Sequence, residues 1–324
     1  MDTNTTASAQ DLRNDDGRSL AWASAESPPS WQSRLIDRLL WLLPLKKQTS
    51  SAAIVQEHVR RLALRPASCA PTRLGRNVRV KLTAWAGWPV YETAPASGAS
   101  RNCVLFLHGG GFINEIVPAH WRFVAHLTRA AGVRCIVPIY PVAPRGTAKE
   151  IVPAVGGLLR ETLAIAATGK VTLIGNSAGA GMALASAQWL RDGGHRQPDE
   201  LVLISPALDA SVSRPEQAEI ATRDPMNDIP GMREVARLYA GELDVAHPWV
   251  SPLNGDLHGL APMVVFAGTH DLLYPDSIAL AEKARTAGVP VELHLRRGQP
   301  HNYPGMPTPE GREAREFILR VLAR

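Results

Sequence analysis

The stretch Val171–Leu190 reads VTLIGNSAGAGMALASAQWL and contains the pentapeptide Gly175-Asn176-Ser177-Ala178-Gly179. Residues 171–174 form a short apolar run typical of a strand, and residues 178–190 form a helical run. A strand that turns abruptly into a helix crowds its neighbours, which explains glycines on both sides of the serine. This pattern, G-x-S-x-G between a strand and a helix, leaves the Ser177 hydroxyl exposed at the start of the helix.

The same alternation of strands and helices continues on both sides of this turn. Apolar runs separated by helical patterns are typical of a parallel sheet that is covered on both faces. We therefore predict an α/β fold with an eight-stranded, mostly parallel sheet. The expected strands are Val78–Trp85, Trp88–Thr93, Cys103–His108, Arg134–Tyr140, Val171–Asn176, Leu201–Ser205, Met263–Gly268 and Val291–Leu295.

Three regions are expected along the chain. Residues 1–30 are polar without an apolar period, which predicts a disordered tail. Residues 31–75 contain two helical stripes, the first of them ended by Pro44, and predict a helical N-terminal segment. Residues 76–324 form the main domain, in which the charge-rich interval at about 207–248 is expected to insert a second helical piece.

The composition excludes several classes of protein. The chain has 324 residues, of which 45% are hydrophobic and 20% charged, so a packed globular protein is expected. The net charge of +5 is local: residues 31–80 hold 10 basic and 2 acidic groups, whereas residues 81–324 hold 23 of each. No zinc-finger spacing or aromatic RNA-binding motif accompanies this charge, so we expect no nucleic-acid partner.

The cysteines and the apolar runs indicate the environment of the protein. Cys69, Cys103 and Cys135 are an odd number without a C-x-x-C pair, which argues against a disulfide framework and a thiolate metal site. The strongest apolar run, residues 39–45, is far shorter than the ~20 residues of a membrane span. We therefore expect a soluble cytoplasmic protein that needs no metal and no organic cofactor.

A second glycine motif, His108-Gly109-Gly110-Gly111-Phe112, follows the third expected strand. Three consecutive glycines allow backbone amides to approach a ligand closely. A Walker-type phosphate loop is excluded because no Gly-Lys-Ser/Thr follows. An H-G-G-G run after a strand, upstream of G-x-S-x-G, is the oxyanion-hole arrangement of lipases and esterases.

A dinucleotide-binding loop is the rival interpretation of the first motif. Gly175, Gly179 and Gly181 form G-x-x-x-G-x-G, which is similar to the loop of short-chain dehydrogenases. That loop follows the first strand of its domain, however, and this one follows four others. None of the five tyrosines has a lysine four residues further on, and no acidic residue ends a following strand as ribose recognition prefers.

Together these motifs resemble the α/β-hydrolase superfamily in its hormone-sensitive-lipase-like branch, the bacterial family IV carboxylesterases, over nearly all of the chain from residue 31. The segment Tyr140-Pro141-Val142-Ala143-Pro144 matches the family's Y-R-L-A-P-E in part, Asn176 replaces the commoner Asp or Thr, and Asp271-Leu272-Leu273 replaces D-P-L. The resemblance implies the α/β-hydrolase fold with a helical cap. It also implies an oxyanion hole made by the backbone amides of Gly110, Gly111 and Ala178.

The partners of Ser177 can be sought from the chemistry, because a serine nucleophile needs a base and the base needs an orienting acid. In this fold the chain order is Ser, then Asp or Glu, then His. Asp271 and His301 each follow an expected strand, so both lie on loops at carboxyl ends of strands, where open α/β sheets bind ligands.

Other candidates for the base and the acid are less well placed. His294 lies inside an expected strand and His270 lies beside Asp271, so both are expected to pack or to lie at the surface. Asp276 is the main competitor of Asp271, but it is expected to begin the next helix, where an acid interacts favourably with the helix dipole.

The resulting hypothesis is a serine carboxylesterase that hydrolyses short- to medium-chain esters through Ser177, His301 and Asp271 and an acyl-enzyme. Since the base must be neutral, activity should fall below about pH 6.5 unless the site shifts the pKa of His301. One alternative is a lactone or N-/O-acetyl hydrolase of the same fold, which residues 250–253 and 268–277 resemble. The other is a non-catalytic ligand-binding protein, against which the intact Ser, His and Asp argue.

The N-terminal helical segment and the insertion resemble the cap of this family. In that interpretation Trp31, Leu35 and Leu39 would line the substrate pocket together with Phe112. The alternative is a basic amphipathic helix on an anionic membrane, with its cationic side chains, Arg34, Arg38, Lys46 and Lys47, towards the headgroups. We prefer the cap because a membrane-bound helix keeps an exposed apolar face, whereas this one has a pocket to cover. The sequence pattern is compatible with a monomer and with a homodimer.

Overall fold

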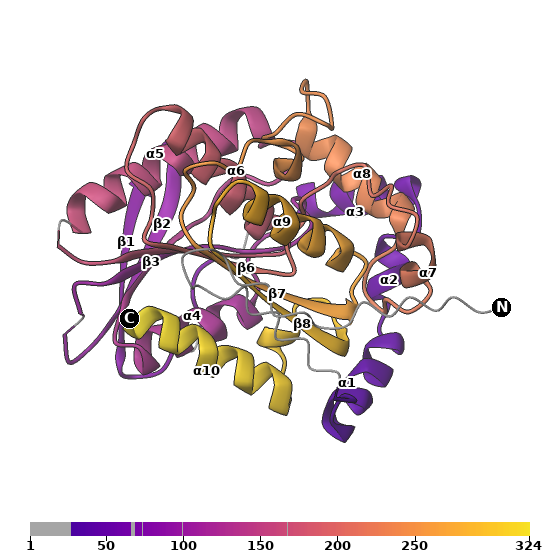
Figure 1. Ribbon diagram of the computed structural model, residues 1–324, viewed down its shortest axis with the longest axis horizontal. Coiled ribbons are helices and arrows are strands. Elements are labelled where there is room, and N and C mark those ends of the chain that lie inside the picture. Colours follow the sequence, from indigo (N-terminus) through magenta and orange to yellow (C-terminus); the bar gives the residue numbers. More distant parts are fainter. Residues whose placement is uncertain (1–26, 66–68, 73, 99, 167) are drawn as a thin grey trace.

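The computed structural model of the protein describes residues 27–65, 69–72, 74–98, 100–166 and 168–324. Its centre is an eight-stranded sheet in the order β1-β2-β4-β3-β5-β6-β7-β8 (Figure 1). β2 pairs antiparallel with β1 and with β4, and all other neighbours are parallel. The predicted α/β fold is therefore confirmed. The strands are β1 Val78–Trp85, β2 Trp88–Pro95, β3 Cys103–Leu107, β4 Arg134–Pro138, β5 Val171–Asn176, β6 Glu200–Ile204, β7 Met263–His270 and β8 Val291–Pro300.

Helices cover both faces of this sheet (Figure 1). One face packs against α5, α6 and α9, and the other against α4 and α10. The helices are α1 Trp31–Trp41, α2 Leu45–Gln48, α3 Ala52–Ala63, α4 Pro118–Ala130, α5 Ala148–Ala166, α6 Ala178–Asp192, α7 Gln217–Ala221, α8 Ile229–Ala240, α9 Tyr274–Thr286 and α10 Pro309–Ala323.

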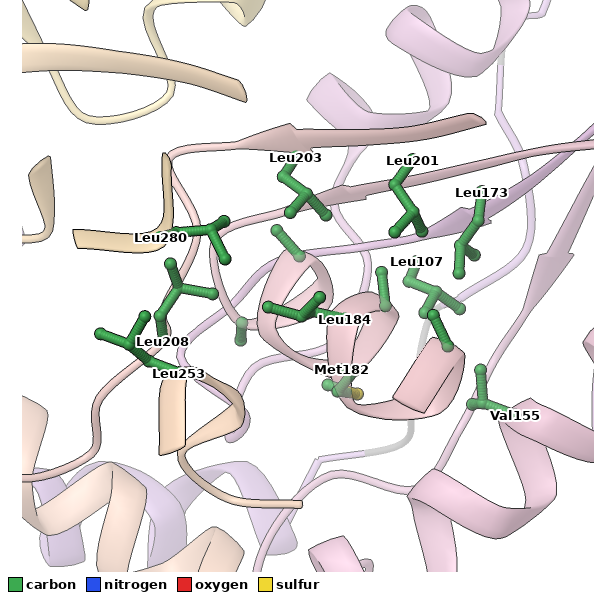
Figure 2. Packing of buried hydrophobic residues seen from close by; sticks show 14 of the residues in the cluster. Leu107, Val155, Leu173, Met182, Leu184, Leu201, Leu203, Leu208, Leu253 and Leu280 are labelled. Atoms are coloured by element: carbon green, nitrogen blue, oxygen red, sulfur yellow. The ribbon is translucent and has the colours of Figure 1, made fainter. Parts of the chain in front are cut away.

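The central strands are apolar on both faces because each face has its own core. On β3, Leu105 and Leu107 belong to the core under α5 and α6, while Val104 and Phe106 belong to the core under α4 and α10. Figure 2 shows the first core, where leucines of β3, β5 and β6 point towards Leu184 of α6. The edge strand β1 differs, because its residues are exposed or half-buried along its whole length.

The last two strands are longer than the sequence pattern predicts. The patterns end at Gly268 and Leu295, but β7 continues to His270 and β8 to Pro300. The two strands stay paired to these ends, with one register irregularity between Gly268 and His270. The extension matters for the site, because the residues that follow directly are Asp271 and His301.

The N-terminal helices pack against two different parts of the main domain. α1 lies against β8 and α10, where Ser30 caps the helix and donates through its hydroxyl to Glu310. α3 lies against α8, which belongs to the interval 207–248. Residues 1–26 of the expected tail lie outside the described residues. No helix in the described part of the chain combines the length and the apolar composition that crossing a bilayer requires.

The contact between α5 and α6 tests how tightly the main core is packed. We expect Gly156→Ala to destabilise the protein by about 1–3 kcal/mol, because a Cβ at Gly156 would overlap the indole ring of Trp189. Gly157→Ala in the same helix is the matched control. Its Cβ would lie 3.1 Å from the Trp85 ring, a tight contact that a small shift of the ring relieves, so we expect a smaller loss of stability. Urea unfolding of both variants measures the difference. Equal midpoints would show that the α5–α6 interface is looser than described.

Candidate functional site

Ser177 lies at the turn between β5 and α6 in a strained backbone conformation. Its φ is 54° and its ψ is −123°, a backbone region that residues other than glycine rarely adopt. The turn brings the start of α6 against β3, and a Cβ at Gly179 would clash with the carbonyl oxygens of Leu107 and His108. The Ser177 N–H donates to Ile204 O at 2.8 Å, which fixes the turn to β6. These contacts explain why the residue at position 179 is small. The exposed hydroxyl predicted for Ser177 is not observed, because Ser177 is buried among these neighbouring segments.

Ser177, His301 and Asp271 form one continuous hydrogen-bonded chain. His301 Nε2 lies 2.9 Å from Ser177 Oγ, and His301 Nδ1 lies 2.9 Å from Asp271 Oδ2. The other carboxylate oxygen of Asp271 accepts from the Leu273 N–H at 3.0 Å. All three side chains are buried. The ends of β5, β7 and β8 thus bring together the three residues that the sequence predicts, in a geometry suited to nucleophile, base and orienting acid.

Electrostatics favours the protonated form of the His301 ring. Burial, the largest single effect, lowers the pKa of His301, but the charge of Asp271, its hydrogen bond and the charge of Asp224 outweigh burial. The net result is a pKa raised above the ordinary 6.5. An imidazole in this position can accept a proton from Ser177 and is stabilised as a cation by the two carboxylates.

The competing candidates lie elsewhere. Asp276, buried in the first turn of α9, pairs with Arg214 at 2.7 Å, and burial raises its pKa to about 7. His294 stacks on Phe266 with ring centroids 4.8 Å apart, within the sheet. His270 Nδ1 faces Asp37 of α1 at 3.5 Å.

The glycine loop after β3 lies beside Ser177 and presents backbone amides. Gly110 and Gly111 have positive φ angles of 136° and 57°, which glycine adopts without strain. Among the described residues, no hydrogen bond uses the N–H of Gly110, Gly111 or Ala178 as its donor. Three backbone donors therefore remain available in this loop and at the start of α6. The loop meets the serine at Gly109, where a Cβ would lie 3.0 Å from Ser177 Cβ.

Asn176 has a role that the sequence analysis missed. Its Oδ1 accepts from the Gly109 N–H at 2.8 Å, and so ties the glycine loop to the residue before Ser177. Its Nδ2 lies 3.4 Å from His120 Nε2, and burial lowers the pKa of His120 to about 3. The only signal in the sequence is the position of Asn176 between Gly175 and Ser177.

His108, the first residue of the glycine motif, is held in place by contacts with Tyr140. The Tyr140 hydroxyl donates to the carbonyl of His108, and the two rings stack with centroids 4.4 Å apart. Burial lowers the pKa of His108 to about 4, so this ring stays neutral. The partial Y-R-L-A-P-E match at Tyr140 is the sequence signal for this contact.

A cavity of about 250 Å³ opens beside His301 and Asn176. Most of its lining is apolar, with Phe106, Phe123, Met226 and Met306 among the contributors. No group of three or more His, Cys, Asp or Glu among the described residues is arranged to hold a metal ion.

The structure does not bring Trp31, Leu35 and Leu39 into this cavity. Their side chains are 64%, 48% and 50% exposed, because α1 turns its opposite side, with the buried Ser33, towards β8 and α10. Phe112 is buried next to the glycine loop and stacks on Tyr239 of α8, with ring centroids 4.0 Å apart. It is not among the residues that line the cavity beside His301.

Comparison with known proteins gives the same picture. A family model described as an alpha/beta hydrolase fold matches residues 104–305. The chain is 32% identical over 225 residues to a triacylglycerol lipase of Mycobacterium tuberculosis, covering 69% of the chain and 47% of the lipase. It is 35% identical over 191 residues to an acetyl-hydrolase of Streptomyces hygroscopicus, covering 58% of the chain and 63% of that protein. The chain thus spans about half to two thirds of the length of these two relatives.

Solved structures agree over a larger part of the chain. A hormone-sensitive lipase from a metagenome library has 27% identity and a TM-score of 0.78, over 90% of this chain and 98% of that one. An esterase from the bacterial hormone-sensitive lipase family has 25% identity and a TM-score of 0.76, over 91% and 98%. From its fold, its motifs and these matches, the chain belongs to the α/β-hydrolase family, in the branch that resembles hormone-sensitive lipase.

Proposed function

We propose that the protein is a serine carboxylesterase with Ser177 as nucleophile, His301 as base and Asp271 as orienting acid. The observation that carries this proposal is the unbroken chain of two 2.9 Å contacts from Ser177 through His301 to Asp271. The similarity to a lipase and to esterases supports it. A protein that only binds a ligand has no need of this arrangement, which argues against the non-catalytic alternative.

The proposed mechanism uses this hydrogen-bonded chain and the backbone amides near it. His301 Nε2 accepts the Ser177 proton while Oγ attacks the ester carbonyl, and Asp271 holds the imidazole through Nδ1. The amides of Gly110, Gly111 and Ala178 stabilise the oxyanion, each contributing about 2.7–4 kcal/mol. His301 then protonates the leaving alcohol, and a water molecule activated by the same histidine hydrolyses the acyl-enzyme. No step requires a metal or an organic cofactor.

The apolar cavity supports an uncharged acyl group of short to medium length. Each buried methylene group contributes about 0.8 kcal/mol, and a cavity of about 250 Å³ limits how many can enter. The acetyl-hydrolase relative favours a second candidate, an O- or N-acetyl hydrolase using the same three residues. The proposal includes a cytoplasmic location, in keeping with the free thiols of Cys103 and Cys135.

We further propose that the cap over the site consists of α3 and the interval 207–248. Support comes from contacts to the glycine loop: Tyr239 of α8 stacks on Phe112, and His58 of α3 lies 2.7 Å from Asn114 Oδ1. Asn114 in turn donates to Gly110 O at 3.0 Å. The interval also contributes Met226 to the cavity.

α1 does not take part in this proposed cap, and its exposed face supports the membrane alternative instead. Six large apolar side chains on or directly after α1 are exposed: Trp31, Leu35, Leu39, Trp41, Leu42 and Leu43. Arg34 and Arg38 lie exposed between them. We propose that this face contacts anionic lipid surfaces, since apolar and cationic groups together favour such an interface.

Replacement of the nucleophile tests the enzymatic proposal. Ser177→Ala should lower kcat on aryl esters by about 10⁴- to 10⁶-fold, because the acyl-enzyme cannot form. Ser186→Ala is the matched control on the same helix and should keep full activity. A series from acetate to dodecanoate should show highest kcat/KM for short to medium acyl chains. Equal rates for Ser177→Ala and the unmodified protein would refute the proposal, whereas activity on acetylated substrates alone would change the substrate class.

The raised pKa of His301 gives an expected pH dependence. The base must be neutral, so activity is lost as pH falls through this pKa, and the decline in kcat/KM should begin above pH 6.5. Measurement of kcat/KM on a neutral ester from about pH 5 to pH 9 tests this. His258→Gln, which replaces an exposed histidine, should leave the profile unmoved. A kcat/KM that keeps its value at pH 9 down to pH values below 6.5 would exclude His301 as the base.

Removal of apolar groups from α1 tests the two interpretations of this helix. Leu35→Ser with Leu39→Ser should abolish sedimentation with anionic vesicles and leave the acyl-length profile unchanged. Leu64→Ser is the control, because this leucine is 86% exposed at the end of α3. A changed acyl-length profile with unchanged vesicle binding would place α1 in the substrate pocket instead.

A further inference from the structure

Asp224 is a buried carboxylate in the loop between α7 and α8, outside the hydrogen-bonded chain of Ser177, His301 and Asp271. Its two oxygens accept four hydrogen bonds. Oδ1 accepts from the N–H groups of Met226 at 2.7 Å and Asn227 at 2.9 Å. Oδ2 accepts from the Leu272 N–H at 2.8 Å and from Asn227 Nδ2 at 3.3 Å. A side chain with this many donors holds its loop in one conformation.

The contact with Leu272 reaches the proposed catalytic acid, because Leu272 directly follows Asp271. The Leu272 carbonyl also accepts from Gln217 Nε2 of α7 at 3.2 Å. The backbone N–H and the carbonyl oxygen of Leu272 are therefore both hydrogen-bonded to the interval 207–248. The next residue, Leu273, donates its N–H to Asp271 Oδ1. The turn that aims Asp271 at His301 is thus fixed from outside as well as from within.

We propose that Asp224 is a positioning residue for the Ser177–His301–Asp271 chain, which holds the Asp271 turn through Leu272 and supplies a second negative charge to His301. The inference rests on the proposed function of these three residues. Asp224 does not touch the reacting atoms.

The N-terminal segment holds Asp224 in place. Lys46 of α2 donates through Nζ to the carbonyl oxygens of Ala221 and, at 3.1 Å, Asp224. A few residues further on, the Asp228 N–H donates to Thr49 Oγ1 at 2.9 Å, and the Gly231 N–H donates to Thr49 O at 2.8 Å. A Cβ at Gly231 would clash with the Thr49 backbone, so this contact depends on glycine. The segment around Lys46 and Thr49 therefore holds the Asp224 loop, and Asp224 in turn holds the turn at Asp271.

The charge of Asp224 acts on the same histidine. It raises the pKa of His301 in addition to the effect of Asp271. Burial, followed by the neighbouring charge of Asp271, raises the pKa of Asp224 itself to about 6, and the cationic form of His301 lowers it. Among the described residues, Asp271 and His301 at the ends of β7 and β8 act on the Asp224 carboxyl, and Lys46 from α2 contacts the Asp224 carbonyl oxygen.

The variant Asp224→Asn tests the proposal. Asn has one acceptor oxygen where four donors now share two, so the Asp271 turn should loosen and kcat on an aryl ester should fall about 10- to 100-fold, with a much smaller change in KM. The acidic limb of the pH profile should move to lower pH, because one negative charge near His301 is lost. Gln217→Ala is the matched control, since it removes the hydrogen bond to the Leu272 carbonyl without changing any charge. The acidic limb of its pH profile should not move.

The outcomes are distinct. An unchanged kcat with an unmoved acidic limb in a folded Asp224→Asn protein overturns the inference. If that variant does not fold, Lys46→Met decides: a lowered kcat supports the inference, and activity equal to that of Gln48→Met, an exposed control on the same helix, overturns it. Ser177→Ala separates the two proposals, because activity retained without Ser177 refutes the proposed function, whereas activity lost there but unaffected by Asp224→Asn refutes only the role of Asp224.

Discussion

The close approach of the α6 N-terminus to the end of β3 is the constraint on which the rest of the site depends. The backbone at Gly179 lies so near the carbonyls of Leu107 and His108 that no Cβ fits between them. This contact forces the positive φ of Ser177 and sets the glycine loop, which continues directly from His108, beside the serine. The strain at Ser177 persists because strands on both sides hold the turn.

A second constraint is electrostatic. The carboxylates of Asp271 and Asp224 are both buried near His301, and such charges are costly unless hydrogen bonds satisfy them. Backbone N–H groups of residues 226, 227, 272 and 273 supply most of the donors. The cost of burying negative charge is thus offset by loop geometry, and the result favours a cationic imidazole. These hydrogen bonds join Asp224 to Leu272, so they form only when the interval 207–248 is packed against the end of β7.

The sequence predicted the parts of the molecule that local rules govern. Strand and helix patterns gave the sheet, and two glycine motifs located Ser177 and the loop at Gly110, because turns and close backbone approaches leave a direct mark on residue choice. Asp271 and His301 could be found because their places follow from the chain order of the fold. The structure brings both to Ser177.

Other features depend on packing between distant segments, which no local pattern reports. Asp224 looks like any charged residue in a charge-rich interval, and its burial is set by α2 and by the Asp271 turn. The apolar stripe of α1 has the period of a helix that packs on a pocket, yet Leu35 and Leu39 are exposed. Periodicity shows that a helix has an apolar face, but it does not say what that face meets.

The exposed edge strand β1 implies that the fold is not equally resistant to opening throughout. Only the side chains at its two ends, Val78 and Trp85, pack against the cores, and its exposed middle is held by the ladder to β2. β3 and β5, in contrast, are buried along their whole length between two layers of helices. Backbone amides should therefore exchange with solvent by local fraying at β1, whereas those beside Ser177 exchange only when the whole domain opens. The residues proposed to carry out the chemistry therefore lie next to the strands whose amides we expect to exchange most slowly.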